Sequence, residues 1–294
     1  MREILNNKLI LGTVQFGLDY GINNIIGKPS FETIKKILDM AYSKGVTILD
    51  TAEAYGDSQE LLGSYHKQTE NKFQIITKFC ASRKDLSEEI IKRVETDIKT
   101  LSIDSLYCYM YHSFSDFVSF YETDMDGIKY LKQKGLIKKF GVSVYSNEEL
   151  EKVLEFKEID LIQLPFNILD NNNLRGKIIQ KAKNNGVEVH TRSTFLQGLF
   201  FKDTNELKNS LKPLKKSLNF LKDISKNNNV AIQNLALGYV YSQKNIDNVL
   251  IGVDTLEQLE ININSIEKKI SNLEIKEIEK IKIEDINLLN PSNW

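Results

Sequence analysis

The stretch Val46-Thr47-Ile48-Leu49-Asp50-Thr51-Ala52-Glu53-Ala54-Tyr55-Gly56 joins a short apolar run to an acidic and a phenolic side chain. Its first four residues predict a short buried strand, so Asp50 should stand at the carboxyl end of that strand. A carboxylate in such a place is costly unless a cation pairs with it. Lys78 can be that cation, because it ends the next apolar run along the chain.

A third apolar run, from Leu106 to Tyr111, ends in the same way with His112. Three successive predicted strands therefore each place a titratable side chain at their carboxyl ends. In a parallel α/β barrel, this end of the strands is where active sites are built. The sequence thus predicts that Asp50, Lys78 and His112 converge on one site, with Tyr55 just beyond the first strand.

Eight apolar segments of strand length alternate with amphipathic helical sequence, which is the pattern of a parallel sheet covered by helices. The expected strands are Leu9 to Thr13, Val46 to Leu49, Phe73 to Thr77, Ser105 to Tyr111, Lys139 to Val144, Leu161 to Leu164, Val187 to Thr191 and Val249 to Gly252. Eight units favour closure into a (β/α)8 TIM barrel over an open sheet. The length of 294 residues suits one domain of this kind, so we expect a single domain over residues 1–294.

Two connections are longer than a barrel requires. The first, Gly17 to Ser30, is rich in glycine and asparagine and is a candidate substrate loop, in which Tyr20 and Asn23 are possible substrate contacts. In the second, residues 199–247, we expect an inserted helix from Leu207 to Ile224 before the helix that includes Ala231 to Tyr241. The charged tail from Asn272 to Ile283 has helical spacing and predicts a solvated surface helix.

The composition argues against several classes of partner. Thirty-nine basic residues balance 40 acidic residues, and the net charge of -1 gives no electrostatic footprint for nucleic acid or for an anionic membrane. No apolar run approaches the roughly 18 residues of a membrane span. Two cysteines are too few for a disulfide scaffold and fit a reducing compartment. We therefore expect a cytoplasmic protein that acts on a small molecule, without a metal site.

The four titratable residues suit proton transfer to a carbonyl oxygen. A free tyrosine titrates near about 10, and the ammonium of Lys78 would lower the pKa of Tyr55 by stabilising its phenolate, while Asp50 keeps that lysine charged. A neutral His112 can donate a hydrogen bond to a substrate carbonyl. None of the four is a hydride source, so reduction of a carbonyl requires a cofactor.

These residues lie in motifs that resemble those of the aldo-keto reductase family over essentially the whole chain. The motifs are Leu49-Asp50-Thr51-Ala52 with Tyr55-Gly56, Ile76-Thr77-Lys78-Phe79, Tyr111-His112, Gly141-Val142-Ser143, Ile162-Gln163 with Asn167, Gln197-Gly198, and Gly252-Val253 with Gln258 and Asn262. The resemblance implies a (β/α)8 barrel that binds NAD(P)H in extended form at the carboxyl ends of its strands. It also implies that Tyr55 is the general acid, assisted by Lys78 and Asp50, with His112 orienting the carbonyl.

The resemblance further implies where the cofactor lies. Ser143 and Gln163 resemble contacts of the nicotinamide carboxamide, with Asn167 supporting that wall, and Gln197 lies in the pyrophosphate segment. The residues from Gly252 onward resemble the segment that holds the adenosine. The complete expected set of cofactor-binding residues is Gly12, Thr13, Ser143, Gln163, Arg192, Ser193, Gln197, Gly198, Gly252, Val253, Asp254, Gln258 and Asn262.

Three positions depart from the family's common pattern. Val144 stands where an asparagine is frequent, so one amide contact to the nicotinamide is missing. Arg192 stands where an aromatic ring usually stacks, and its guanidinium could stack on the nicotinamide, bind an anionic substrate group or form a buried ion pair, for example with Glu188. Asp254 would repel a 2′-phosphate and accept a hydrogen bond from a ribose hydroxyl, which favours NADH, with NADPH as the alternative.

Several other functions and placements compete with these. Lys78 could instead form a Schiff base, as in barrel lyases, although pairing with Asp50 would favour the charged amine. The chain could also be a cofactor-binding regulatory subunit with little turnover, resembling the aldo-keto reductase-like β-subunits of ion channels. We expect His190 to be a packed barrel histidine and His66 to lie at the surface. The loops suggest a polar, sugar-like or anionic carbonyl substrate.

Overall fold

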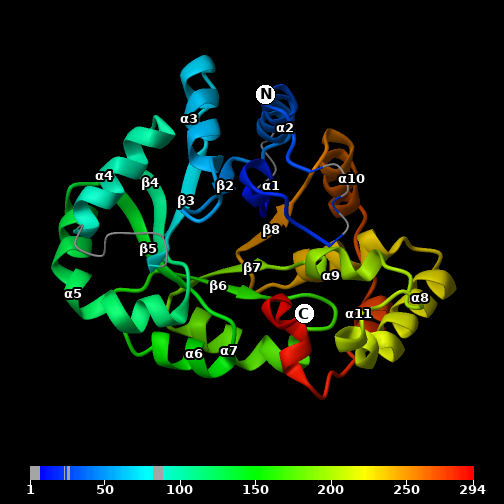
Figure 1. Cartoon of the computed structure of the whole chain (residues 1–294). Coiled ribbons are helices and arrows are strands. Elements are labelled where there is room, and N and C mark those ends of the chain that lie inside the picture. Colours follow the sequence, from blue (N-terminus) through cyan, green and yellow to red (C-terminus); the bar gives the residue numbers. More distant parts are fainter. Residues whose placement is uncertain (1–6, 23, 25–26, 82–88) are drawn as a thin grey trace.

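The computed structural model describes residues 7–22, 24, 27–81 and 89–294, and its centre is a closed barrel of eight parallel strands. The strands follow one another around the barrel in sequence order, and β8 pairs with β1 to close it. Helices surround these strands on the outside (Figure 1). The predicted (β/α)8 TIM barrel is thereby confirmed.

The strands lie close to their predicted positions. They are β1 Leu9–Gly12, β2 Ile48–Asp50, β3 Gln74–Phe79, β4 Leu106–Tyr111, β5 Ile137–Ser143, β6 Leu161–Pro165, β7 Glu188–Arg192 and β8 Asn248–Gly252. The longer helices are α2 Phe31–Ser43, α3 Ser58–Gln68, α4 Ile90–Leu101, α5 Phe114–Gln133, α7 Asn172–Asn184, α8 Lys215–Asn228, α9 Ile232–Ser242 and α10 Leu256–Glu267. Shorter elements are α1 Val14–Gly17, α6 Asn147–Val153, α11 Asn272–Ile278, and the 3-10 turns η2 Leu196–Phe201, η3 Asn209–Leu214, η4 Ile286–Leu289 and η5 Pro291–Asn293.

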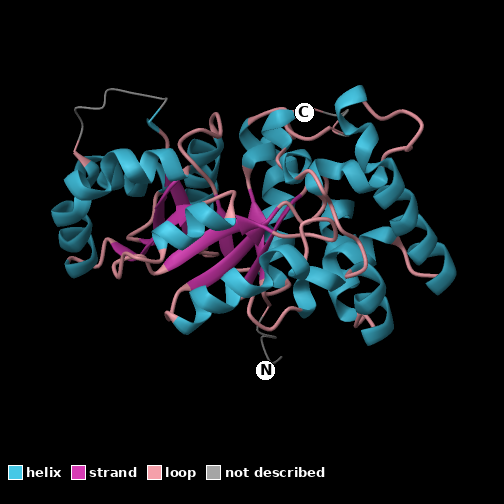
Figure 2. Cartoon of the chain, turned by 90° about the horizontal axis from the view of Figure 1, so that it is seen from below, coloured by secondary structure: helices cyan, strands magenta, loops and turns pink. Residues whose placement is uncertain are grey.

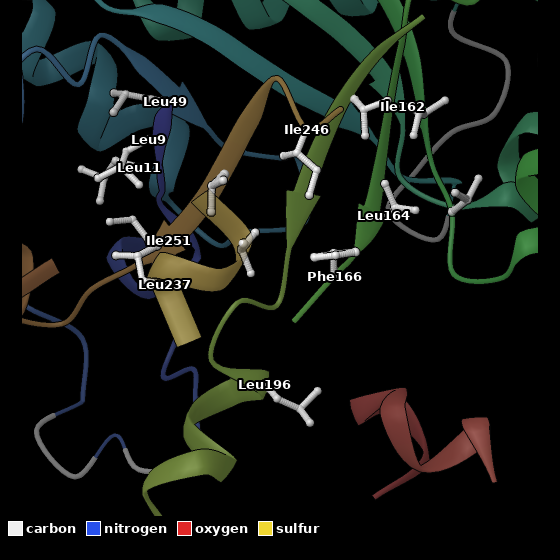
Figure 3. Packing of buried hydrophobic residues seen from close by; sticks show 14 of the residues in the cluster. Leu9, Leu11, Leu49, Ile162, Leu164, Phe166, Leu196, Leu237, Ile246 and Ile251 are labelled. Atoms are coloured by element: carbon white, nitrogen blue, oxygen red, sulfur yellow. The ribbon is translucent and has the colours of Figure 1, made fainter. Parts of the chain in front are cut away.

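The apolar core lies mainly between the strands and the helices. Leu9 and Leu11 of β1 and Ile251 of β8 pack in this layer with Leu237 of α9 (Figure 3). The alternate residues point into the barrel, where Ile10, Ile76, Cys108, Met110 and Leu161 form a second, smaller apolar cluster. Because successive strand residues face opposite sides, each strand contributes one residue set to each core.

Two predicted helices differ from the structure in their bounds. The helix expected from Leu207 begins only at Lys215, because Pro213 lacks the backbone N–H that a continuing α-helix needs, and Asn209–Leu214 form the 3-10 turn η3 instead. The tail helix expected to reach Ile283 is α11, which ends at Ile278.

Helices enclose the strands on both sides in Figure 2. None of the helices in the described ranges is long and apolar enough to cross a membrane.

Candidate active site

A cavity of about 580 Å³ opens at the carboxyl ends of the strands. Its volume is within the usual range for sites that bind small ligands and cofactors. Most of the predicted site residues line it, namely Gly12, Asp50, Tyr55, His112, Ser143, Gln163, Arg192, Ser193, Gln197, Gly198, Gly252, Asp254, Gln258 and Asn262. Lys78, Thr13 and Val253 are buried and do not line it.

Strand alternation and strand register bring these side chains together. Asp50 and Lys78 are two residues beyond the interior positions Ile48 and Ile76, so they point into the barrel as well. On the other side of the barrel, Ser143 and Gln163 are direct partners in the pairing of β5 with β6. Residues far apart in the sequence thus meet at the same height in the barrel.

Asp50 is the hub of a buried polar cluster. One carboxylate oxygen accepts a hydrogen bond from Lys78 Nζ, and the other accepts one from Gln163 Nε2 at 2.8 Å. Lys78 Nζ also donates to the backbone oxygen of Thr51 at 3.0 Å, and its side chain is 1% exposed. Burial lowers the pKa of Lys78, and the Asp50 carboxylate opposes that shift. The pairing predicted from the two strand ends is therefore present.

Tyr55 is held in place by two glycines that allow a close backbone approach. A Cβ at Gly17 would lie 1.8 Å from the backbone oxygen of Tyr55, and a Cβ at Gly56, whose φ is +59°, would lie 2.2 Å from the Gly17 oxygen. Only glycine fits both positions without displacing the backbone. The loop after β2 is thereby fixed against the short helix α1, with the Tyr55 side chain lining the cavity.

The pKa of Tyr55 shifts in the opposite direction to the one that the sequence suggested. Burial is the main cause and Asp50 a lesser one, and together they raise the pKa above the usual value of a phenol, while the guanidinium of Arg192 acts against them. Lys78 lies with its Nζ 5.2 Å from the centre of the Tyr55 ring. Asp50 already compensates the positive charge of Lys78, so this charge does not bring the pKa of Tyr55 down. The phenol therefore stays protonated.

His112 lies beside Tyr55, with ring centroids 5.6 Å apart and the rings nearly perpendicular. Burial lowers its pKa to about 3, with smaller contributions from the charges of Lys78 and Arg192. The ring is therefore neutral at physiological pH, as the sequence predicted. Its buried Nδ1 has no hydrogen-bond partner among the described residues.

Arg192, at the end of β7, is partly buried and stacks on an aromatic ring that the sequence analysis did not single out. Its guanidinium carbon lies 3.9 Å from the centre of the Tyr145 ring, and one N–H donates to the backbone oxygen of Val144 at 3.2 Å. The suggested ion pair with Glu188 is absent, because Glu188 instead pairs with Lys139 and contacts His190. Arg192 therefore belongs to the cavity wall.

The segment after β7 forms a strained turn along the cavity. Ser193, Leu196 and Gln197 all have positive φ angles, between 47° and 63°, which is uncommon for residues other than glycine. Asn167 supports this turn through a hydrogen bond from its Nδ2 to the Ser193 oxygen at 3.1 Å. Such left-handed residues often occur where a protein binds a ligand.

Described residues of the first loop contact the segments after β7 and β8. The Tyr20 hydroxyl accepts a hydrogen bond from Gln197 Nε2 at 2.9 Å, and Ile22 N donates to the Gln197 oxygen at 3.3 Å. Asn24 Nδ2 reaches Asp254 Oδ1 at 3.3 Å. Asn23, the other residue suggested as a substrate contact, lies outside the described residues.

Asp254 and Gln258 line the part of the cavity that follows β8. The backbone N–H of Asp254 donates to Gln258 Oε1 at 2.7 Å, and Gln258 Nε2 lies 3.4 Å from Asp254 Oδ2. Asn262 Oδ1 accepts a hydrogen bond from Gln233 Nε2 at 2.7 Å. This part of the cavity thus offers carboxylate and amide groups.

Several lining residues were missed by the sequence analysis: Gln15, Asn24, Tyr145, Phe195, Phe201, Gln233 and Ser292. A signal existed for Tyr145, because it follows Ser143 by two residues and so has the same strand parity. Gln15 and Gln233 had no such signal, since they lie on helices whose orientation depends on packing. Among the described residues, no cluster of His, Cys, Asp and Glu could hold a metal ion.

The two remaining histidines behave differently from each other. His190 is packed inside the barrel with Nε2 2.6 Å from Glu188 Oε1, in agreement with the prediction, and burial lowers its pKa to about 3. The surface position expected for His66 is wrong, because His66 is 1% exposed and its Nδ1 lies 2.9 Å from the Leu101 oxygen. It faces α4, and the polar residues around it in the sequence lie on the outer face of α3.

Comparison with known proteins relates the chain to the aldo/keto reductase family. The sequence model of the aldo/keto reductase family matches residues 8–283. Aldo-keto reductase YhdN of Bacillus subtilis is 29% identical over 183 residues, which are 58% of this chain and 54% of that protein. The NADH-specific methylglyoxal reductase of Escherichia coli is 23% identical, with 79% of this chain and 82% of that protein covered.

Solved structures share the fold. The holo form of aldo-keto reductase AKR11C1 from Bacillus halodurans superimposes with a TM-score of 0.75 over 93% of this chain and 91% of that chain. The sequence identity to this structure is 19%, so the similarity concerns the barrel architecture.

Proposed function

This chain belongs to the aldo/keto reductase family of NAD(P)H-dependent oxidoreductases, and we propose that it interconverts an aldehyde or ketone and an alcohol, with Tyr55 as the general acid and base. The observation that carries the proposal is the position of Tyr55, which lines the cavity beside His112 and next to the buried Asp50–Lys78 pair. Burial and Asp50 raise the pKa of this phenol, so it retains a proton to give.

The residues around Tyr55 have separate tasks in this proposal. In the reducing direction, Tyr55 donates its proton to the carbonyl oxygen as negative charge develops there. The phenolate that forms is stabilised by the guanidinium of Arg192, with a smaller contribution from Lys78, whose charge is largely offset by Asp50. Asp50 holds Lys78 in place through the buried pair. His112, which is neutral, orients the carbonyl oxygen by a hydrogen bond from its ring.

The donor set of the cavity fits a nicotinamide dinucleotide. When bound, such a cofactor supplies or accepts the hydride that none of these side chains can carry. Ser143 and Gln163 would hold the carboxamide, the turn at Gln197 and Gly198 the pyrophosphate, and Gln258 and Asn262 the adenosine. Gln15 supports this fit independently, since its buried Oε1 lines the cavity wall without a partner among the described residues. A ribose hydroxyl can provide the missing donor.

The part of the cavity lined by Asp254 favours NADH over NADPH. Asp254 places a carboxylate there, and it would repel a 2′-phosphate. Among the described lining residues the only lysine or arginine is Arg192, whose guanidinium stacks on Tyr145. No cation is therefore available at the Asp254 end to bind the extra phosphate of NADPH.

A Schiff-base lyase is disfavoured by the position of Lys78. Its side chain is 1% exposed, does not line the cavity and is committed to Asp50 and the Thr51 oxygen. A substrate carbonyl could not reach this amine without displacing the ion pair. Borohydride trapping with candidate carbonyl compounds should therefore leave Lys78 unmodified.

Cofactor binding and turnover test the proposal in two steps. The purified protein is first titrated with NADH and NADPH while nicotinamide fluorescence is followed. Cofactor oxidation is then measured over a panel of aldehydes that includes methylglyoxal, which is the substrate in the name of the E. coli relative. We expect binding of NADH and measurable turnover. Absence of binding would refute the function, and binding without turnover over the whole panel would instead indicate a regulatory subunit.

A further inference from the structure

The end of the cavity around Tyr55 carries an uncompensated positive charge. Among the described lining residues, those with a formal charge are Asp50, Arg192 and Asp254. Lys78 neutralises Asp50, and Asp254 contacts Asn24 and Gln258 and forms no ion pair with Arg192. His112 and Tyr55 are neutral. Arg192 is therefore the one net charge near the reacting groups.

The guanidinium of Arg192 is fixed in place by Tyr145. The Tyr145 ring lies 3.9 Å below the guanidinium carbon, and the Tyr145 backbone is itself held at both ends. Its N–H donates to Glu149 Oε2 at 2.6 Å, and its oxygen accepts a hydrogen bond from Arg175 Nη2 at 2.8 Å. Arg175 in turn pairs with the buried Asp170. A cation positioned in this way requires little ordering when a ligand binds.

Most hydrogen-bond donors of Arg192 are free to bind a ligand. A guanidinium has five N–H groups, and in the described part of the chain one of them is used, by the Val144 oxygen. No carboxylate of a described residue forms an ion pair with it, whereas the buried Arg175 pairs with Asp170. A planar guanidinium can form two parallel hydrogen bonds with the oxygens of a carboxylate or a phosphate.

The position of Arg192 relative to the reacting groups indicates what the anion is part of. Arg192, Tyr55 and His112 line the same cavity. The charge of Arg192 also lowers the pKa values of both Tyr55 and His112, which agrees with their position in the same cavity. An anion held by Arg192 would thus belong to the molecule whose carbonyl faces Tyr55.

We propose that the substrate is an aldehyde or ketone that carries a carboxylate or phosphate group, and that Arg192 binds this group. The proposal rests on the reductase function given above. It narrows the substrate from carbonyl compounds in general to anionic ones.

The competing role for Arg192 is to stack on the nicotinamide ring of the cofactor instead of binding the substrate. A guanidinium there would repel the oxidised ring, which is positively charged, and would tolerate the neutral reduced ring. Removing the charge would then tighten NAD+ relative to NADH. It would leave the preference among carbonyl substrates unchanged.

The test compares matched substrates in the wild type and in Arg192→Met, Arg192→Lys and Lys212→Met. Lys212 lies in η3 outside the cavity lining, so its replacement controls for the loss of one positive charge. The substrate pairs are 4-oxobutanoate with butanal, and glyceraldehyde 3-phosphate with glyceraldehyde. We expect kcat/KM to favour the anionic member of at least one pair by about 10- to 100-fold in the wild type and in Lys212→Met. Arg192→Met should abolish this preference, and Arg192→Lys should retain part of it.

A binding measurement keeps this result separate from the reductase function. Titration calorimetry with succinamate and with its neutral counterpart succinamide needs no turnover, and we expect only succinamate to bind, in an Arg192-dependent manner. If NADH and NADPH fail to bind, the reductase function falls, whereas loss of succinamate binding alone overturns the anion site. An anion preference that is absent in the wild type, or that persists in Arg192→Met, also overturns it. A changed ratio of NAD+ to NADH affinity with unchanged substrate preference assigns Arg192 to the nicotinamide instead.

Discussion

Replacement of Tyr55 by phenylalanine separates the chemistry of this site from its architecture. The variant keeps the ring, which packs against His112 with centroids 5.6 Å apart, and removes only the hydroxyl. General acid catalysis typically contributes about 10²- to 10⁴-fold to a rate, so the activation barrier should rise by about 3–5 kcal/mol. We expect kcat for the reduction of an aldehyde to fall by that factor.

Stability and cofactor binding should hardly change in this variant. The side-chain contacts of Tyr55 with described residues involve its ring and not its hydroxyl, so the usual loss of about 1 kcal/mol for a broken hydrogen bond does not apply. Urea unfolding, NADH titration and steady-state turnover measure the three quantities on the same preparation.

Tyr130→Phe is the matched control, because Tyr130 is 42% exposed on α5 and lies outside the cavity lining. Turnover of Tyr55→Phe within about threefold of the wild type would refute the assignment of Tyr55 as the proton donor. Equal loss of turnover in Tyr130→Phe would show that the effect is not specific to the site.

Three further predictions concern the cofactor, the buried ion pair and the pH dependence. Asp254→Arg should shift the ratio of NADH to NADPH affinity toward NADPH, and an unchanged ratio in fluorescence titrations would show that this segment does not contact the 2′ position. Lys78→Met leaves the Asp50 carboxylate buried without its cation, so the free energy of unfolding in urea should fall by about 3–5 kcal/mol; a loss below about 1 kcal/mol would mean that water replaces the lysine. His112 and His190 have pKa values lowered to about 3 in the folded state, against about 6.5 when unfolded, so the stability that each neutral ring contributes is present above pH 6.5 and is lost as the pH falls toward 3. The free energy of unfolding at pH 7 should exceed that at pH 5 by about 2 kcal/mol for each of these histidines. In His190→Gln this pH difference should be smaller by about the same amount. The same pH dependence in the variant and the wild type would contradict the assignment for His190.

The sequence by itself determined the barrel and the approach of Asp50, Lys78 and His112. Each of these residues ends an apolar run, and in a parallel barrel the ends of neighbouring strands meet. The information is local, because strand parity and strand order suffice to place such a residue. Ser143 and Gln163 were expected at the site only from the resemblance to the family, and they are direct partners in the pairing of β5 with β6.

The sequence was less informative about where the helices begin and which of their faces are buried. The shortened start of α8 follows from Pro213, which the sequence displays, but the buried position of His66 does not follow from its polar neighbours. That side chain is buried because α3 packs on α4, where the Leu101 oxygen meets the ring. Packing between helices is a property of the whole chain.

Only the tertiary structure decided the environment of the site residues. The sequence suggested that Lys78 lowers the pKa of Tyr55, but burial dominates and raises it. The sequence also offered Glu188 as a partner for Arg192, whereas the folded chain places Tyr145 under the guanidinium and commits Glu188 to Lys139. Desolvation and partner choice depend on which distant segments come into contact, and no local pattern records those contacts.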